Sequence, residues 1–210
     1  MTRLGVVRFK VRVETNQVMK HGFKSASERR SISVRAELGL KPADPLSARQ
    51  LAAYLNVAVL GVDQVPGVTP ALLGHLLGSD PESWSAFTVA PPEMTLIVLN
   101  TAHSPARQES DLMHEASHLL CEHEPSELVT IPGLDLPIRT FNKAQEEEAD
   151  WLAGCLLLPR PVLELAMRRG LSDFQIAEEY GASYQMIRYR RGVTGVALQK
   201  SRWKGRRQPV

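Results

Sequence analysis

The sequence is poor in the features that mark disulfide-stabilised or membrane proteins. Only two cysteines, Cys121 and Cys155, occur in 210 residues, so a disulfide framework does not organise the fold. The longest apolar runs, such as LAGCLLLP, are far shorter than the about 20 residues that span a bilayer. The first thirty residues show no signal peptide, because the apolar run LGVV is short and Arg and Lys residues interrupt the chain after it. We therefore expect a cytoplasmic protein that does not contact a membrane.

The overall composition is that of an ordinary globular protein, with 43% hydrophobic residues and a formal net charge of +2. That near-balance conceals one asymmetry, since residues 187–210 contain many Arg and Lys and no acidic residue. A solvated, mobile end is the favoured interpretation, and contact with nucleic acid or an acidic partner is the alternative. The length suits one domain, or one domain with a small appendage.

Pattern and capping signals predict a mostly helical α+β fold with a small antiparallel sheet. Pro and Gly at several points predict an irregular loop between residues 124 and 142. The expected helices cover residues 25–38, 47–55, 70–78, 104–122, 143–158, 160–170 and two segments within 172–192. The expected strands are 57–62 and a hairpin within 84–100.

The segment LMHEASHLLCEHEP carries the clearest chemical signal. His114 and His118 are four residues apart in a predicted helix, so both imidazoles lie on one face and can bind one ion. Glu115, one step round, can reach a water bound to that ion. This H-E-x-x-H arrangement is typical of zinc hydrolases, in which the Glu is the general base.

A catalytic zinc needs a third protein ligand and an open position for water, and two geometries can supply the ligand. Glu124 could return from the end of the same helix, but Cys121 stands where such enzymes have a turn-forming glycine, and cysteine is strained at positive φ. Cys121 could also close the metal shell itself, although a small buried hydrophobe is the favoured interpretation. The second geometry takes a carboxylate from the later segment QEEEADWLAGCLLLP.

In that segment, Glu146 and Asp150 are four residues apart at the edge of an apolar stripe. A carboxylate there is costly unless something positive meets it, which favours Glu146 as the metal ligand. Asp150 on the same side can hold the other ring nitrogen of a ligand histidine. Glu147 and Glu148 are expected on other faces, as solvated acidic residues at a helix start.

These motifs together resemble the ImmA/IrrE family of bacterial metallo-endopeptidases. The sequence HEASH is followed by EEEADWLAGCLLLP, which fits the signature E-x-x-A-[ND]-x-[FL]-A-x-x-L-L-x-P and places the family's ligand Glu on Glu146. WSAF and IVLN…SPARQ precede them, and the resemblance covers roughly residues 23–192. Leu158 stands where Met is common, a minor core exchange.

The resemblance implies a zincin-like core at residues 23–165, a helix-turn-helix-like unit at 166–192, and basic ends at 1–22 and 193–210. It implies one Zn²⁺ per chain, with Mn²⁺ as the alternative, held by His114, His118 and Glu146. It also implies a protein substrate, a helix-turn-helix transcriptional repressor whose cleavage derepresses stress, prophage or mobile-element genes. The residue that stabilises the oxyanion stays open among Arg107, His103, His123 and Tyr180.

The last patterned unit, DFQIAEEYGASYQMIRYRRG, has the small–turn–apolar spacing of a helix-turn-helix, with Ala177, Gly181 and Ile187 in those roles. Its second helix would display side chains able to meet phosphates and bases. They are Tyr184, Gln185, Arg188 and Arg191. A structural or substrate-docking role is favoured over DNA contact. The competing function is a DNA-binding regulator in which the metal site is structural or sensory.

Overall fold

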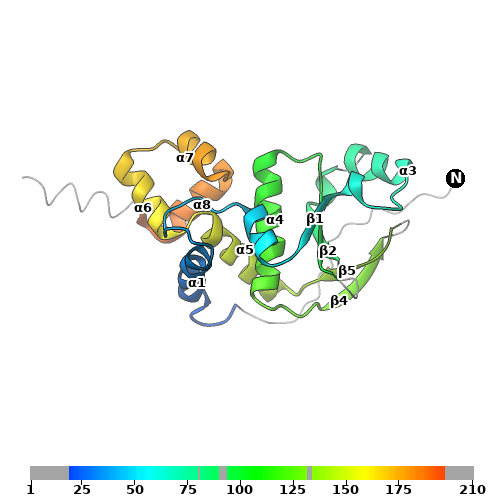
Figure 1. The fold of residues 1–210 in the computed structure, drawn as a ribbon, viewed down its shortest axis with the longest axis horizontal. Helices are drawn as coiled ribbons and strands as arrows, with labels where there is room; N and C mark the ends of the chain where they lie inside the picture. The colour runs from blue at the N-terminus through cyan, green and yellow to red at the C-terminus, as the bar shows by residue number, and fades with distance from the viewer. Residues whose placement is uncertain (1–18, 80, 90–93, 132–133, 197–210) are drawn as a thin grey trace, which may run out of the picture.

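The computed structural model describes residues 19–79, 81–89, 94–131 and 134–196. Most of the predicted basic ends, residues 1–22 and 193–210, therefore lies outside the described residues. Among the residues that the structure describes, no helix is both long enough and apolar enough to cross a lipid bilayer. Figure 1 shows a sheet on one side, helices on the other, and one long helix between them.

Capping side chains mark the starts of most helices, at Ser47 and Ser104 as predicted, whereas the first helix begins at Phe23 and not near Ser25. Ser47, Ser104, Asn142, Ser172 and Ser183 each accept a hydrogen bond from the backbone N–H three residues on, which satisfies one free donor of the first turn. The helices are α1 (Phe23–Glu37), α2 (Ala48–Tyr54), α3 (Pro70–Leu73), α4 (Pro105–Leu120), α5 (Lys143–Leu157), α6 (Arg160–Arg169), α7 (Asp173–Tyr180) and α8 (Tyr184–Thr194). A π-helical turn, Gly74–Ser79, continues α3.

The sheet has five strands in the order β1-β3-β2-β5-β4. They are β1 (Ala58–Gly61), β2 (Ala86–Val89), β3 (Leu96–Leu99), β4 (Glu127–Ile131) and β5 (Leu134–Thr140). The predicted hairpin is confirmed, because β2 and β3 are antiparallel with Ala86 opposite Leu99. The sheet is mixed where a small antiparallel sheet was expected, since β1 runs parallel to β3. A helix and turns connect β1 to the hairpin, and such a long crossover allows parallel pairing.

The predicted irregular loop at residues 124–142 is also wrong, because β4 and β5 form an antiparallel pair there. The proline within β5 is tolerated because Pro137 lies close to an irregularity in the pairing at Thr130 and Ile131. β5 joins the rest of the sheet at Val89 and Ile138. That tertiary contact, together with the β-branched residues of the segment, outweighs the Pro and Gly signals.

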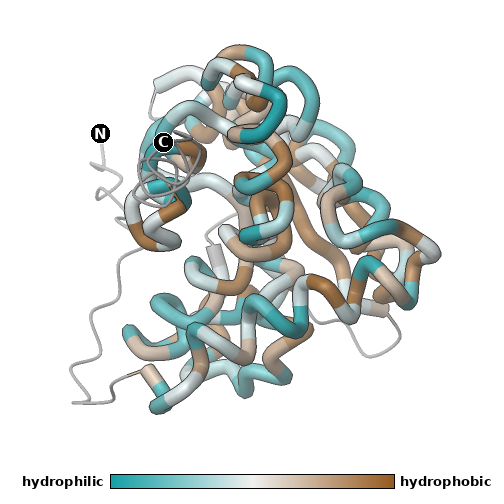
Figure 2. The backbone as a smooth tube through the Cα atoms, turned by 90° about the vertical axis from the view of Figure 1, so that its left-hand side faces the viewer, coloured by the Kyte–Doolittle hydropathy of each residue, from teal (hydrophilic) through white to brown (hydrophobic). Residues whose placement is uncertain are grey.

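The helix α4 is the centre of the molecule. It packs against α2 and α5 on one side and against β2 and β3 on the other (Figure 1). Its buried residues Leu112, Met113 and Ala116 belong to the larger hydrophobic core, which α1, α5, α6, α7 and α8 complete. A smaller cluster around Trp84 and Phe87 fills the space between the sheet and α3. Figure 2 shows hydrophobic and hydrophilic residues alternating along the backbone. Side chains on α4 are therefore held on a helix packed from both sides.

Candidate metal centre

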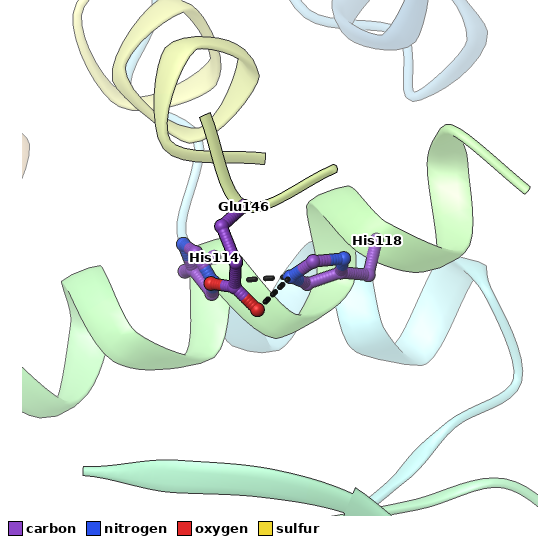
Figure 3. A group of neighbouring side chains, drawn as sticks. All are labelled: His114, His118 and Glu146. Carbon is purple, nitrogen blue, oxygen red and sulfur yellow. Dashed lines mark hydrogen bonds and ion pairs between the residues drawn. The ribbon is translucent and has the colours of Figure 1, made fainter. Parts of the chain in front are cut away.

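The candidate centre lies where α4 meets the start of α5 (Figure 3). His114 and His118 lie one turn apart on α4, and their Nε2 atoms are 3.1 Å from one another. Glu146, in the first turn of α5, brings Oε2 to 3.2 Å from Nε2 of His114 and Oε1 to 3.7 Å from Nε2 of His118. One ligand atom from each residue lies within 4.8 Å of the others, so the structure brings the three predicted ligands together.

This donor set fits a zinc ion. Two imidazole nitrogens and one carboxylate oxygen are ligands that zinc prefers, and three protein ligands leave the fourth tetrahedral position for water. Within the part of the chain that the structure describes, this is the one group of His, Cys, Asp or Glu side chains close enough to hold an ion.

Asp150 occupies the far side of His114, whose Nδ1 lies 2.9 Å from Oδ1 of Asp150. Asp150 is one turn after Glu146 on α5, so one helix reaches both ring nitrogens of His114. A carboxylate can only accept a hydrogen bond, which places a proton on Nδ1. Nε2 of His114 therefore faces the other candidate ligands.

The surroundings of His118 were not predicted from the sequence. Its Nδ1 lies 2.9 Å from Nδ1 of His123, and Nε2 of His123 lies 3.2 Å from Oε2 of Glu148. The other oxygen of Glu148 accepts the backbone N–H of Lys20. The expectation that Glu148 is solvated is thus wrong, since its side chain is 5% exposed. Phe141 also stacks on the ring of His118, with centroids 3.7 Å apart.

A sequence signal for Glu148 existed. It lies four residues before Leu152 and seven before Cys155, so it falls on the same buried helical stripe. No such signal marks His123, which lies beyond the end of α4. Glu122 there adopts φ 53, which turns the chain back and lets the N–H of His123 bond to the carbonyl of His118.

Glu115, the predicted general base, is half-buried beside the ligands. The hydroxyl of Thr88 on β2 donates a hydrogen bond to its Oε2 at 2.6 Å. Burial raises the pKa of Glu115, and the opposing effects of His114 and Thr88 do not cancel that rise. A raised pKa brings the carboxylate closer to the pH at which a general base is most effective.

The two histidines have opposite acid–base properties without a metal. Burial opposes the charged form of His114, but the hydrogen bonds with Asp150 and Glu146 outweigh it and raise its pKa to about 10. Burial and the nearby His114 lower the pKa of His118 to about 2. His114 is therefore protonated at neutral pH, whereas His118 is neutral.

The alternative ligands lie outside this group. Cys121 ends α4 and packs against the hydrophobic core, and burial raises the pKa of its thiol to about 12. Glu124 is exposed, and its backbone carbonyl accepts a hydrogen bond from the side chain of Gln145. Neither belongs to the set that surrounds the Nε2 atoms of the histidines.

The four candidates for the oxyanion-stabilising residue are engaged elsewhere. Arg107 pairs with Glu82, and His103 with Asp111. The hydroxyl of Tyr180 donates to the carbonyl of Ala43. The fourth candidate, His123, lies behind His118 rather than on the Nε2 side of the ligands.

The C-terminal unit has the predicted turn, since Gly181 between α7 and α8 adopts φ 64 and Ile187 is fully buried. Among the four predicted contact residues, Tyr184, Gln185 and Arg188 are exposed on the first turns of α8. Arg191 instead is half-buried and pairs with Asp173 at the start of α7. That ion pair ties the two helices together, which gives Arg191 a structural role.

Comparison with known proteins gives one family match. The family model Peptidase_M78, described as an IrrE N-terminal-like domain, matches residues 79–191, more than half of the chain. Among solved structures, a Mycobacterium tuberculosis transcriptional regulator is similar, with a TM-score of 0.44 and 13% identity. The match covers 80% of this chain and 46% of that protein, so the chain spans about half its length, and the likeness is too low to carry an argument. No curated protein sequence matches significantly.

Proposed function

The chain belongs to the Peptidase_M78 family, and from this premise we propose that it is a zinc-dependent endopeptidase. The family supports a metallopeptidase role, and the His-His-Glu cluster is compatible with a metal ion. The observation that carries the proposal is the approach of Glu146 to His114 and His118, with Glu115 next to His114 in the chain and close enough for the two charges to interact. A purely structural zinc site has four protein ligands, whereas this set has three.

In the proposed reaction, Nε2 of each histidine and the carboxylate of Glu146 would hold the metal. The chemistry that a zinc ion would supply there is polarisation of a peptide carbonyl and a lower pKa, about 7, for a bound water. Glu115 accepts the proton of the attacking water and later delivers it to the leaving amine. Thr88 holds one oxygen of Glu115 in place, so the other oxygen is available for that proton.

We propose a protein substrate, a helix-turn-helix transcriptional repressor cleaved in the cytoplasm so that stress, prophage or mobile-element genes are derepressed. The support is the resemblance of the two motifs to the ImmA/IrrE peptidases. In this proposal residues 23–165 carry the peptidase, and the unit at 166–192 docks the substrate. Zinc is favoured over manganese because histidine nitrogens make up most of the ligand set.

The test compares Glu115→Gln with the wild type. The substitution keeps the shape of the side chain and removes the base, so metal content and folding should persist. Cleavage of a repressor encoded beside the gene should fall by about 10²–10⁴-fold, at the upper end of that range. Glu147→Gln, on the exposed face of α5, is the matched control. If Glu115→Gln still derepresses the target promoter in cells, proteolysis is not the mechanism.

The second candidate function is a DNA-binding regulator with a structural or sensory metal. The exposure of Tyr184, Gln185 and Arg188 on α8 is the observation in its favour. Arg188→Ala would then weaken DNA binding. A gel-shift measurement on the target promoter separates the two functions. Deleting the chain after Gly192 should spare zinc binding in both.

A further inference from the structure

Glu148 fixes the proton of His123. The two oxygens of this buried carboxylate face Nε2 of His123, at 3.2 Å, and the backbone N–H of Lys20, at 3.0 Å. A carboxylate has acceptors only, and burial is tolerated when donors meet both of its oxygens. Nε2 of His123 must therefore be the donor.

That assignment determines the next proton. A neutral imidazole with its proton on Nε2 has a lone pair on Nδ1. Nδ1 of His123 lies 2.9 Å from Nδ1 of His118, a distance at which one of the two nitrogens carries a hydrogen and the other accepts it. His118 must then donate through Nδ1, and its Nε2 is left with the lone pair that points toward His114 and Glu146.

We infer that His123 and Glu148 are positioning residues, which keep the proton of His118 on Nδ1 and so leave Nε2 free for a metal ion. The inference rests on the proposed metal centre and adds to it a buried relay, Glu148–His123–His118. Asp150 keeps a proton on Nδ1 of His114, and the relay keeps one on Nδ1 of His118 through an additional imidazole. Reversal of the chain of protons would put a hydrogen on Nε2 of His118 and block that ligand.

A merely structural role explains these contacts less well. His123 and Glu148 have side-chain exposures of 4% and 5%. Apolar residues of similar volume would fill such a place at lower free energy than a buried polar pair. A purely packing role would not require His123 to meet Nδ1 of His118, the one ring nitrogen that faces away from the ligand set.

The first test is Glu148→Gln. Glutamine offers one acceptor oxygen and one N–H₂ group, so the N–H of Lys20 and Nε2–H of His123 cannot both be accepted. If the amide N–H₂ faces His123, the proton of His123 moves from Nε2 to Nδ1. The proton of His118 then moves from Nδ1 to Nε2. Zinc affinity, measured by competition with a chelator, should fall about 10–100-fold. Glu147→Gln, the same change one residue away on the exposed face, should leave it unchanged.

The second test uses His123. Asparagine can place its oxygen near the position of Nδ1 and accept the proton of His118, whereas alanine cannot. His123→Asn should therefore retain more zinc affinity than His123→Ala, with thermal unfolding of the metal-free proteins as the check on folding. Equal losses in the two variants, or no difference between Glu148→Gln and Glu147→Gln, would overturn the inference and leave the proposed peptidase intact.

A third measurement is independent of metal. Long-range ¹H–¹⁵N NMR spectra of the metal-free wild type distinguish the two histidine tautomers. We expect the proton on Nδ1 in His118 and on Nε2 in His123. A proton on Nε2 of His118 would contradict the relay even if zinc binds tightly. Failure of the wild type to bind zinc would instead contradict the proposed function, and the tautomers would still test the relay.

Discussion

The two candidate histidine ligands have opposite surroundings. His114 is 21% exposed and its partner Asp150 is 73% exposed, so water reaches this side of the centre. His118 is 1% exposed, and its contacts with His123 and Phe141 lie in the interior. Solvent screens the first interaction and not the second. The centre thus combines one rigidly held ligand with one that faces solvent.

This difference indicates how the site can work. Glu146 is 46% exposed and lies toward His114, so solvent reaches the ligands from the side of His114 and Glu146. A water molecule and a peptide substrate need such an approach. The buried side gives the site its fixed geometry, since the ring of His118 is held at Nδ1 and by a stacked aromatic ring.

The largest expected effect comes from the residue that joins the two sides. Glu146→Gln removes the charged oxygen that approaches both histidines, so zinc affinity should fall by more than the about 10–100-fold cost of losing a supporting partner. Metal analysis after gel filtration measures it. Glu147→Gln should keep about one zinc per chain. A loss in Glu147→Gln or Glu124→Gln in place of Glu146→Gln would show that the ligand is wrongly assigned.

The pH dependence of zinc binding should come from the exposed side. The pKa of His114 is raised to about 10 in the metal-free protein, so below that pH its proton must leave before Nε2 binds a metal. Apparent affinity should therefore decrease as the pH falls, by about ten-fold per pH unit for one proton. Zinc titrations between pH 6 and pH 8 measure the slope. A flat profile would mean that His114 is already neutral.

The same asymmetry explains what could be predicted from the sequence. Helical periodicity placed His114, His118, Glu146 and Asp150, because all four lie on two regular helices. His123 could not be placed, because the left-handed turn at Glu122 that returns it to α4 leaves no periodic pattern. β4 and β5 were missed for a related reason, since their pairing depends on contacts distant in sequence.

A smaller effect is expected for Asp150→Asn. The amide oxygen still accepts the proton on Nδ1 of His114, and water can compensate for the lost charge because the side chain is exposed. Zinc affinity should fall by about ten-fold at most, the lower end of the range for a supporting partner. Chelator competition on Asp150→Asn and Glu148→Gln side by side checks it. A greater loss in Asp150→Asn would reverse the comparison between the two sides.

The smallest effect is expected for Phe141→Leu. The ring of Phe141 lies nearly parallel to that of His118, at 12°. Leucine preserves much of the apolar contact but removes the stacking, a contribution of about 0.5–1.5 kcal/mol for an aromatic pair. Zinc affinity should fall by about 2–10-fold, with the fold retained. Phe174→Leu, on an exposed position of α7, is the control and should change nothing. If Phe141→Leu binds zinc as tightly as the wild type, the hydrogen bond from His118 to His123 is sufficient to hold the ring.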